Sequence, residues 1–337
     1  MESPLIDLHR AAGAALAEYD GVLLPRSFST LEEEYRAGRQ ASALYDSNWR
    51  AIFLLTGRDR VQYLHNISSN DIKSLGEGQG TLALLLNPQG HILAEIEVYV
   101  LPEKLLVLTH VSGRAETLAT LKKYVIGSQV KIEDLTDRYG SVGVVGLASD
   151  LPDSSAKETT VGAEPGWELR RTRVGTPGTE FLVPRAEVGA LWQKLLAEVR
   201  AAGGGPIGMD ALHGLRLAAG VPWYPADFGE AQIPHEAALE NTHISFNKGC
   251  YTGQEIVERV RSRGSVNRKR VGLSFSTPEP PAAGTKLRAV GGAEVGFVSS
   301  VAAMPGGQNA IGMGYVRREQ FPSGSVLEFD GGTATVR

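Results

Sequence analysis

The only cysteine of the chain, Cys250, lies in the stretch FNKGCYTGQE (246–255). Lys248 precedes it by two residues, and the following segment, GQEIVERVRS (253–262), predicts a helix. A nearby cation and a helix N-terminus both favour the thiolate, which is the reactive form of cysteine. A lone cysteine is also commonly a small buried hydrophobic residue. The residues by themselves therefore favour a reactive and a structural role for Cys250 equally.

A second candidate for chemistry is a pair of carboxylates in NPQGHILAEIEVYV (87–100). Residues 87–90 predict a tight turn with proline at its second position. The residues after the turn alternate in the manner of a strand, which places Glu95 and Glu97 on one face. Two carboxylates at this spacing can form an interacting pair. The alternative is a solvated sheet face, and the spacing alone favours that alternative.

Three further patterns have plain structural explanations. The glycine-rich GEGQG (76–80) lacks the preceding strand of a dinucleotide-binding loop and the lysine of a P-loop, which indicates an ordinary loop. The seven histidines show no metal-ligand spacing, so we expect no metal site. The basic run RVRSRGSVNRKR (259–270) could bind phosphate, a polyglutamate tail or a nucleic acid. Because no aromatic residues flank it for stacking, a solvated helix end is the stronger interpretation.

Composition limits the class of protein. The chain has 337 residues, of which 42% are hydrophobic and 21% charged, as in ordinary globular proteins. Its net charge of -4 provides no basic field, so we expect no direct nucleic-acid partner. One cysteine excludes an intramolecular disulfide and a self-contained iron–sulfur cluster. The N-terminus does not resemble a signal peptide, and the longest apolar runs are too short to cross a membrane. We therefore expect a cytoplasmic protein with no membrane partner.

The predicted elements indicate an α+β fold with antiparallel sheets. Residues 1 to about 40 predict a helix followed by an irregular stretch, and strands and helices then alternate with short hairpins. A second round of strands near 139–146, 167–174 and 179–184 precedes an amphipathic helix over 186–201. Residues 221–250 are mostly irregular, and irregular segments of this length are usually functional.

The last part of the chain has a different texture. After Arg270, short apolar runs are divided by glycines at spacings near ten residues, which is typical of a small barrel or sandwich. We therefore predict two domains, residues 1–267 and 268–337. The first consists of two similar halves, roughly 45–130 and 131–267.

Several motifs resemble those of a known family. KGCYTGQE (248–255), followed by Arg259 and by Arg263-Gly264, resembles the signature of the YgfZ-type folate-binding proteins, which are related to the glycine cleavage T-protein. IPHEAAL (233–239), LRLAAG (215–220) and the strand-turn-strand around residue 90 support the resemblance, which covers roughly residues 45–335.

This resemblance implies a fold and a function. The implied fold is a folate-binding α+β region of two similar antiparallel-sheet halves around a central channel, with a small C-terminal β-barrel. The implied function is a monomeric, tetrahydrofolate-binding accessory protein that supports assembly or repair of iron–sulfur enzymes, including tRNA-modifying ones. Its partners would be iron–sulfur proteins, and Cys250 would be its functional thiol. The residues expected to contact folate are Asn70, Glu95, Tyr99, Lys248, Tyr251 and Arg259.

Two departures from the T-protein pattern bear on the activity. T-proteins resemble GG-x-x-D-D after the turn, whereas this chain has Ala94-Glu95. They also resemble LRLEAG, and this chain has Ala218 in place of the glutamate that holds the pterin. Both changes argue against aminomethyl transfer, although Glu95 can stand in for the missing aspartate. An aminomethyltransferase and a non-catalytic, folate-gated scaffold therefore stay open as alternatives.

Overall fold

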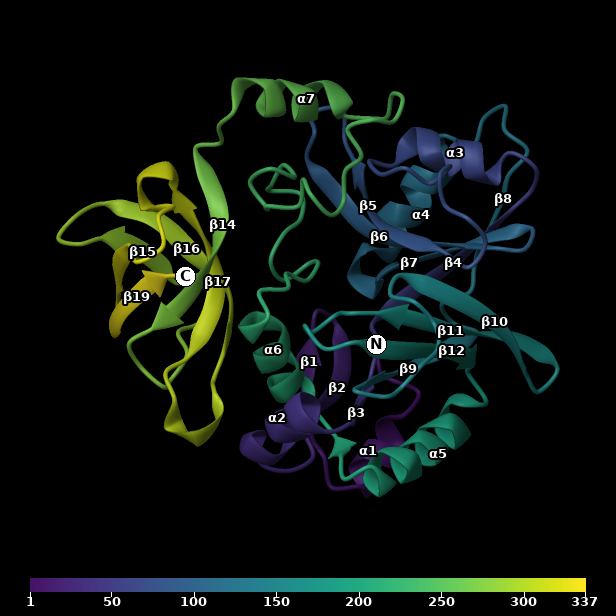
Figure 1. Ribbon diagram of the computed structural model, residues 1–337, viewed down its shortest axis with the longest axis horizontal. Coiled ribbons are helices and arrows are strands. Elements are labelled where there is room, and N and C mark those ends of the chain that lie inside the picture. Colours follow the sequence, from purple (N-terminus) through teal and green to yellow (C-terminus); the bar gives the residue numbers. More distant parts are fainter.

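In the computed structural model, which describes residues 1–337, the alternating segment after the turn forms a long strand of a five-stranded antiparallel sheet (Figure 1). The order of this sheet is β5 (Gly80–Leu86), β6 (Ile92–Leu101), β7 (Lys104–His110), β4 (Arg50–Thr56) and β8 (Lys131–Asp134). Its core contains apolar residues of α3 (Arg60–Ile67) and of α4 (Arg114–Lys123).

A second sheet has six strands, of which only β13 and β3 pair in parallel. Its order is β10 (Ser155–Val161), β11 (Glu164–Arg171), β12 (Gly178–Pro184), β9 (Tyr139–Val145), β3 (Ala43–Asp46) and β13 (Gly205–Pro206). The apolar face of α5 (Val188–Ala201) packs against it. The two sheets share a core that contains both Tyr99 of β6 and Trp167 of β11.

The N-terminal segment is more regular than the sequence predicts. After α1 (Ile6–Ala11) comes a hairpin of β1 (Ala15–Tyr19) and β2 (Val22–Ser27), and then α2 (Leu31–Gln40). The expected irregular stretch is thus a strand, a loop and a helix. Thr30 caps α2 in a capping box with Glu33. The hairpin packs against α6 (Met209–Ala218).

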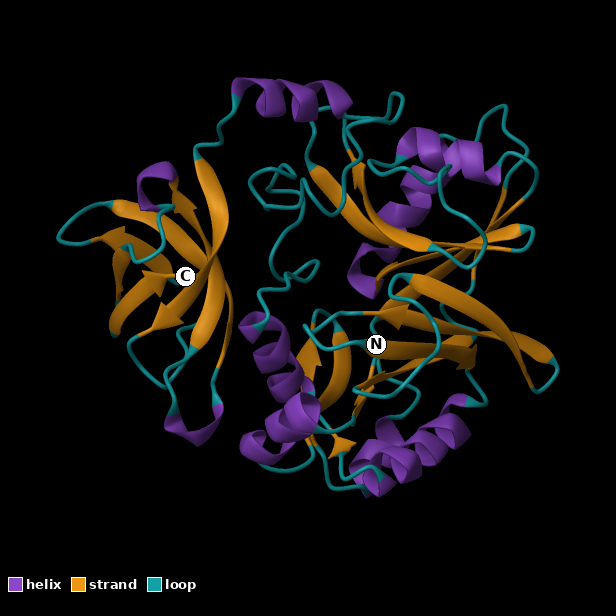
Figure 2. Ribbon diagram, in the orientation of Figure 1, coloured by secondary structure: helices purple, strands orange, loops and turns teal.

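The C-terminal segment closes on itself as a six-stranded barrel (Figure 2). Around the barrel the order is β14 (Arg268–Phe275), β17 (Ile311–Arg317), β16 (Glu294–Ala302), β15 (Lys286–Ala289), β18 (Val326–Phe329) and β19 (Gly332–Val336). The predicted fold, α+β with antiparallel sheets and a C-terminal barrel, is confirmed. No helix combines the length and the apolar character needed to cross a membrane.

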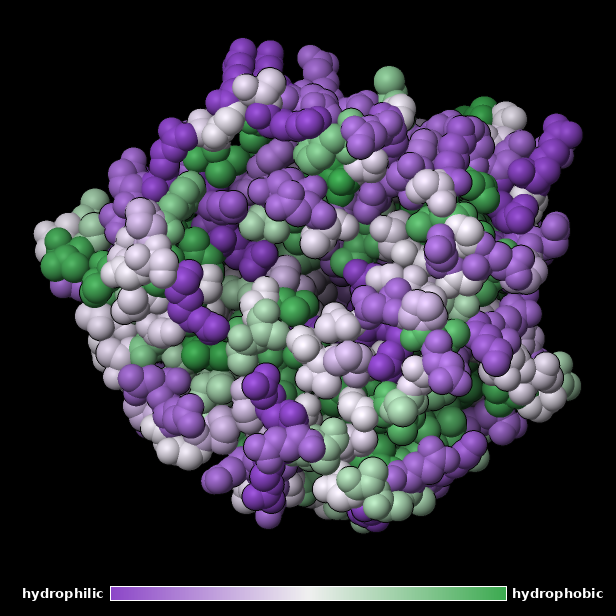
Figure 3. Space-filling view, in the orientation of Figure 1, coloured by the Kyte–Doolittle hydropathy of each residue, from purple (hydrophilic) through white to green (hydrophobic).

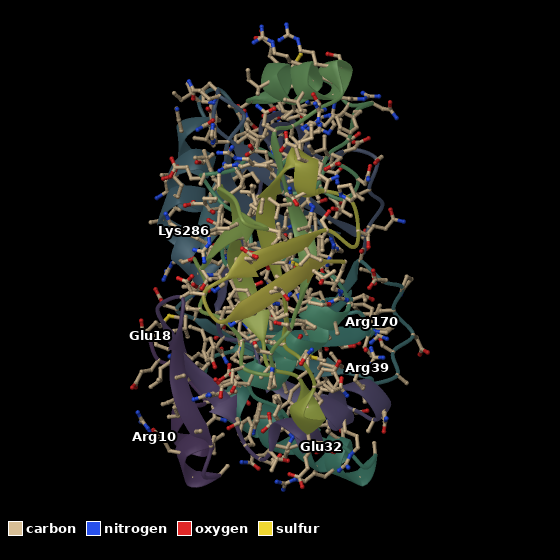
Figure 4. The ribbon with its side chains drawn as sticks, turned by 90° about the vertical axis from the view of Figure 1, so that its left-hand side faces the viewer. Arg10, Glu18, Glu32, Arg39, Arg170 and Lys286 are labelled. Atoms are coloured by element: carbon tan, nitrogen blue, oxygen red, sulfur yellow. The ribbon has the colours of Figure 1, made fainter.

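A long irregular segment connects the sheets to the barrel. It runs from the end of α6 to α7 (Gln254–Arg263), and it passes between the sheets and the barrel (Figure 1). Viewed from the barrel side, α7 lies at one end of the molecule, whereas Arg10 and Glu32 lie at the other (Figure 4). The irregular segment is buried at several points, among them Phe228, Leu239 and Tyr251.

Candidate functional site

A cleft lies at the meeting point of the first sheet, the N-terminal hairpin, α6 and the irregular segment. The space-filling view shows a recess near the centre of this face (Figure 3). The volume of the cleft is about 40 Å³. The residues that line it are Tyr19, Asp20, Leu24, Trp49, Arg50, Glu95, His110, Arg173, Met209, His213, Trp223, Tyr224 and Ala226.

The cleft opens toward a larger chamber. This chamber, of about 430 Å³, lies between the hairpin, α6 and the barrel, and four of its lining residues also line the cleft. Cleft and chamber together reach the volume typical of ligand pockets, whereas the cleft alone does not. A third cavity of about 600 Å³ between α2 and α5 is lined by none of the predicted folate residues.

Aromatic rings form much of the cleft wall. The ring centroids of Trp49 and Trp223 lie 5.7 Å apart, and His213 meets Trp223 edge-on at 5.3 Å. Tyr19, from the hairpin, stacks on His213 at 6.1 Å. Flat apolar surfaces with polar edges are suited to hold a planar heterocycle.

Glu95 is the carboxylate that the strand presents to the cleft. Strand alternation turns its neighbour Ala94 into the core, where it is fully buried, while the Glu95 side chain stays 21% exposed. The Glu95 carboxylate contacts Nε2 of His243 at 2.9 Å, and Nδ1 of His243 contacts the Thr242 hydroxyl at 2.7 Å. This chain of contacts fixes the direction of the carboxylate.

Glu97 lies in different surroundings from Glu95. It is buried between the sheets, where it accepts hydrogen bonds from Arg173 and from the Tyr99 hydroxyl. Arg50 also donates to the Glu97 carboxylate, and it makes two hydrogen bonds to the Glu180 carboxylate, at 2.9 and 3.0 Å. The solvated sheet face that the spacing favoured is therefore wrong for Glu97, and each carboxylate has its own partner from a distant part of the chain.

Two histidines of the cleft stay neutral at physiological pH. Burial and, to a smaller extent, the charge of Arg216 lower the pKa of His213 to about 3. Consistently, Arg216 donates to Nδ1 of His213 at 3.2 Å. Burial and the charge of Arg50 lower the pKa of His110 to about 4. Arg50 and Arg173 also line the cleft, where both are paired with Glu97 and Glu180.

Cys250 is exposed on the loop that leads into α7. The buried, structural role is therefore wrong for this residue. The loop is tied down next to it, because Lys248 donates to the carbonyl oxygens of His65, Ser68 and Asn70. Burial lowers the pKa of Lys248 to about 8. The ammonium group is thereby engaged with the end of α3, so it does not supply the expected free cation beside the thiol.

A glycine supports the same loop. Gly253 has φ +80°, and a Cβ atom on it would lie 2.6 Å from the carbonyl oxygen of Asn87. Glycine is required both by this left-handed conformation and by the close approach. The start of α7 therefore rests directly on the turn at 87–90.

The other predicted folate contacts divide into two groups. Asn70 and Tyr251 belong to the Cys250 loop region, where Asn70 donates to the Leu82 carbonyl and the Tyr251 ring lies 5.0 Å from Lys248 Nζ. Tyr99 is fully buried between the sheets, and Arg259 is exposed on α7. Of the predicted set, only Glu95 lines the cleft.

Most cleft residues were not predicted from the sequence. Trp49, His110, Arg173 and Trp223 come from separate segments, and no local motif unites them. Tryptophan was the available signal, because the chain has only four and two of them line the cleft.

Comparison with known proteins agrees with this architecture. The aminomethyltransferase of Rubrobacter xylanophilus is 28% identical over 330 residues, covering 94% of this chain and 87% of that protein. The aminomethyltransferase of Saccharopolyspora erythraea is also 28% identical, covering 98% and 93%. The crystal structure of glycine cleavage system aminomethyltransferase T from Bartonella henselae has the same fold, with a TM-score of 0.91, 24% identity and coverage of 100% and 96%. The family model of the GCVT N-terminal domain matches residues 5–248, and the chain therefore belongs to this family.

Proposed function

We propose that the chain binds tetrahydrofolate in the cleft and uses Glu95 in a one-carbon transfer of the aminomethyltransferase type. The observation that carries the proposal is the Glu95 carboxylate, held by His243 at 2.9 Å in a cleft whose wall includes several aromatic rings. Tetrahydrofolate is the cofactor that membership in the family implies, and it supplies the nitrogen that accepts the one-carbon unit.

The strand geometry weakens one argument against transfer. Ala94 lies in the core, so a residue at that position does not reach the cleft whatever its type. Glu95 is the position that faces the ligand, and it retains a carboxylate. The replacement at Ala218 is a real loss, because this residue ends α6 and brings no acceptor to a pterin edge. His213, neutral and five residues earlier on α6, is the group available for that edge.

The other residues of the cleft fit the same cofactor. A pterin ring matches the flat surfaces of Trp49 and Trp223. The ring is larger than the 40 Å³ of the cleft, so binding requires the lining side chains to turn toward the adjoining chamber.

The test is Glu95→Gln, with ammonia release from an aminomethyl-lipoyl carrier as the readout. We expect tetrahydrofolate binding within a few-fold of wild type, because the amide keeps the shape and one acceptor. Ammonia release should fall by about a hundredfold, the usual contribution of a positioned acid or base. Glu164→Gln, an exposed glutamate on β11, is the matched control. Full activity of Glu95→Gln would contradict the role of Glu95 in the transfer. Absence of folate binding by calorimetry would contradict the assignment of the cleft as a folate site.

A second candidate function rests on Cys250. Its thiol is exposed, and it lies within the KGCYTGQE stretch on a loop held in place by Lys248 and Gly253. These features support an accessory role in assembly or repair of iron–sulfur enzymes, including tRNA-modifying ones. Because one thiolate cannot hold a cluster alone, any contact with iron would be shared with a partner protein.

Complementation separates this role from the first. In a strain deficient in iron–sulfur repair, Cys250→Ser should fail to restore the dependent enzymes while keeping normal folding and folate affinity. Glu95→Gln should restore them if only binding is needed. Full complementation by Cys250→Ser would leave the protein as a transferase or a folate-gated scaffold, and the ammonia assay distinguishes these two.

A further inference from the structure

A second pocket lies on the α7 side of the barrel, apart from the cleft. It has a volume of about 480 Å³, within the range of small-ligand sites, and shares no lining residue with the cleft. The irregular segment, the end of α7, the connection to β14 and the short helix after β17 all contribute to its wall. Its lining residues include His235, Glu240, Phe246, Arg261, Lys269, Arg318 and Phe321.

The wall offers surfaces for a planar ring. Phe246 and Phe321 both line the pocket, and the guanidinium of Arg261 lies 4.3 Å from the Phe246 ring centroid. His235 lies beside Phe246 with its ring centroid 6.4 Å away. A heterocycle in this pocket would meet aromatic rings, on which nucleobases stack in proteins.

Polar atoms at the pocket wall lack protein partners. Both ring nitrogens of His235 and Oε2 of Glu240 are buried without a hydrogen bond. Buried polar groups are nearly always paired, so three unpaired atoms along one wall indicate a partner of another kind. Turning these side chains toward a ligand breaks no existing hydrogen bond. The Glu240 carboxylate can then accept a hydrogen bond from the exocyclic amino group of a base, and the His235 imidazole can form a hydrogen bond with a ring nitrogen of the base.

The rim of the pocket is cationic. Arg318 is exposed and makes no ion pair, and Arg261 makes only a long contact of 3.5 Å with Glu258. Lys269 contacts Glu240 at 3.7 Å. Although the whole chain carries a net charge of -4, these cations stand beside one pocket. Cations beside a pocket can bind the phosphate of a ligand whose ring lies inside it.

We propose that this pocket binds a nucleoside monophosphate. The base would stack on Phe246 with its amino edge toward Glu240, and the phosphate would lie against Arg318 and Arg261. The basic run at 259–270 would thus form part of a ligand site. The alternative interpretation of this run is a solvated helix end with no ligand. This proposal does not depend on folate binding, because no residue of the cleft takes part.

The test is calorimetric titration of the full chain with AMP, GMP, CMP and UMP, with adenosine, and with inorganic pyrophosphate. We expect at least one amino-bearing nucleotide to bind more tightly than either adenosine or pyrophosphate. Arg318→Gln should weaken that binding by about tenfold, as expected for a charge-assisted hydrogen bond. Arg317→Gln is the matched control, since Arg317 is an exposed neighbour outside the pocket. Phe246→Leu should also weaken binding without changing folate affinity.

Other outcomes overturn the proposal. Equal losses in Arg317→Gln and Arg318→Gln would show diffuse attraction to charge, and pyrophosphate binding as tightly as the nucleotides would show that the base is not recognised. Competition by 5-formyltetrahydrofolate would place the nucleotide in the cleft. Much tighter binding of a single-stranded oligonucleotide would make the surface a nucleic-acid site. No heat of binding at 10 mM nucleotide would also end the proposal.

Discussion

At the residue scale, the chemistry of the cleft depends on side chains that find partners far away in the sequence. The alternation of β6 predicted that Glu95 and Glu97 share a face, but not that His243 would hold one and Arg173 the other. These partners lie 148 and 76 residues away. Local pattern fixes the direction of a side chain on a strand, whereas its charge environment is set by tertiary contacts.

The neutral state of His213 leads to a prediction on pH. Its folded-state pKa is about 3 and its ordinary value is 6.5, so between these values the unfolded chain binds more protons. Stability should therefore fall as pH falls from about 6.5 toward 3. Between pH 7 and 5 the contribution of this one histidine is about 1–2 kcal/mol.

Urea unfolding of wild type and His213→Gln at pH 7 and pH 5 measures this contribution. Glutamine keeps an acceptor for Arg216 but does not titrate, so the variant should lose less stability on acidification. Equal losses in the two proteins would contradict the assigned neutral state. Wild-type ring resonances that titrate near pH 6.5 by NMR would contradict it as well.

At the element scale, strong periodicity was predictive and weak local signals were not. The strand at 92–101, the helix at 188–201 and the barrel strands followed from alternation or helical spacing. The β1–β2 hairpin was missed, although Asp20 and Gly21 both have positive φ at its turn. An Asp-Gly pair between two short apolar runs is a known hairpin signal. Its strands are short and partly exposed, so they lack a clear pattern.

The junction between the irregular segment and the barrel depends on Asp227. Its carboxylate accepts from Arg216 Nη1 at 2.5 Å and from the Ser299 hydroxyl at 2.8 Å, and the Ser300 hydroxyl also donates to it. The hydroxyl of Tyr315 donates to its carbonyl oxygen at 2.7 Å. One residue thus joins α6, the irregular segment and two barrel strands.

We predict that Asp227→Asn lowers the free energy of unfolding by about 3–5 kcal/mol, because Arg216 is fully buried and loses its counter-charge. Asp330→Asn is the control, since the Arg288–Asp330 pair is exposed on the barrel and its loss should change stability little. Urea denaturation measures both. Losses of the same size in the two variants would show that the buried pair is not the junction described above.

At the scale of the whole molecule, the cleft belongs to several elements at once. Glu95 comes from the first sheet, Tyr19 from the N-terminal hairpin, His213 from α6 and Trp223 from the irregular segment. A ligand that contacts all four would connect segments that are separate in the sequence. Such an arrangement cannot be predicted from local motifs, because it exists only after the sheets, hairpin and helix have packed.

This shared construction predicts how folate binding changes the whole protein. A ligand confined to β6 and the Cys250 loop would protect only those amides from hydrogen exchange. A ligand in the cleft should also protect the β1–β2 hairpin and residues 221–227, because both contribute lining side chains. At a hundredfold excess over Kd it should raise the free energy of unfolding by about 2.7 kcal/mol. Hydrogen exchange with and without 5-formyltetrahydrofolate tests this, with Trp49→Ala as the variant that should lose protection in all segments together. Protection limited to the Cys250 loop would place the folate outside the cleft and leave the role of Glu95 without support.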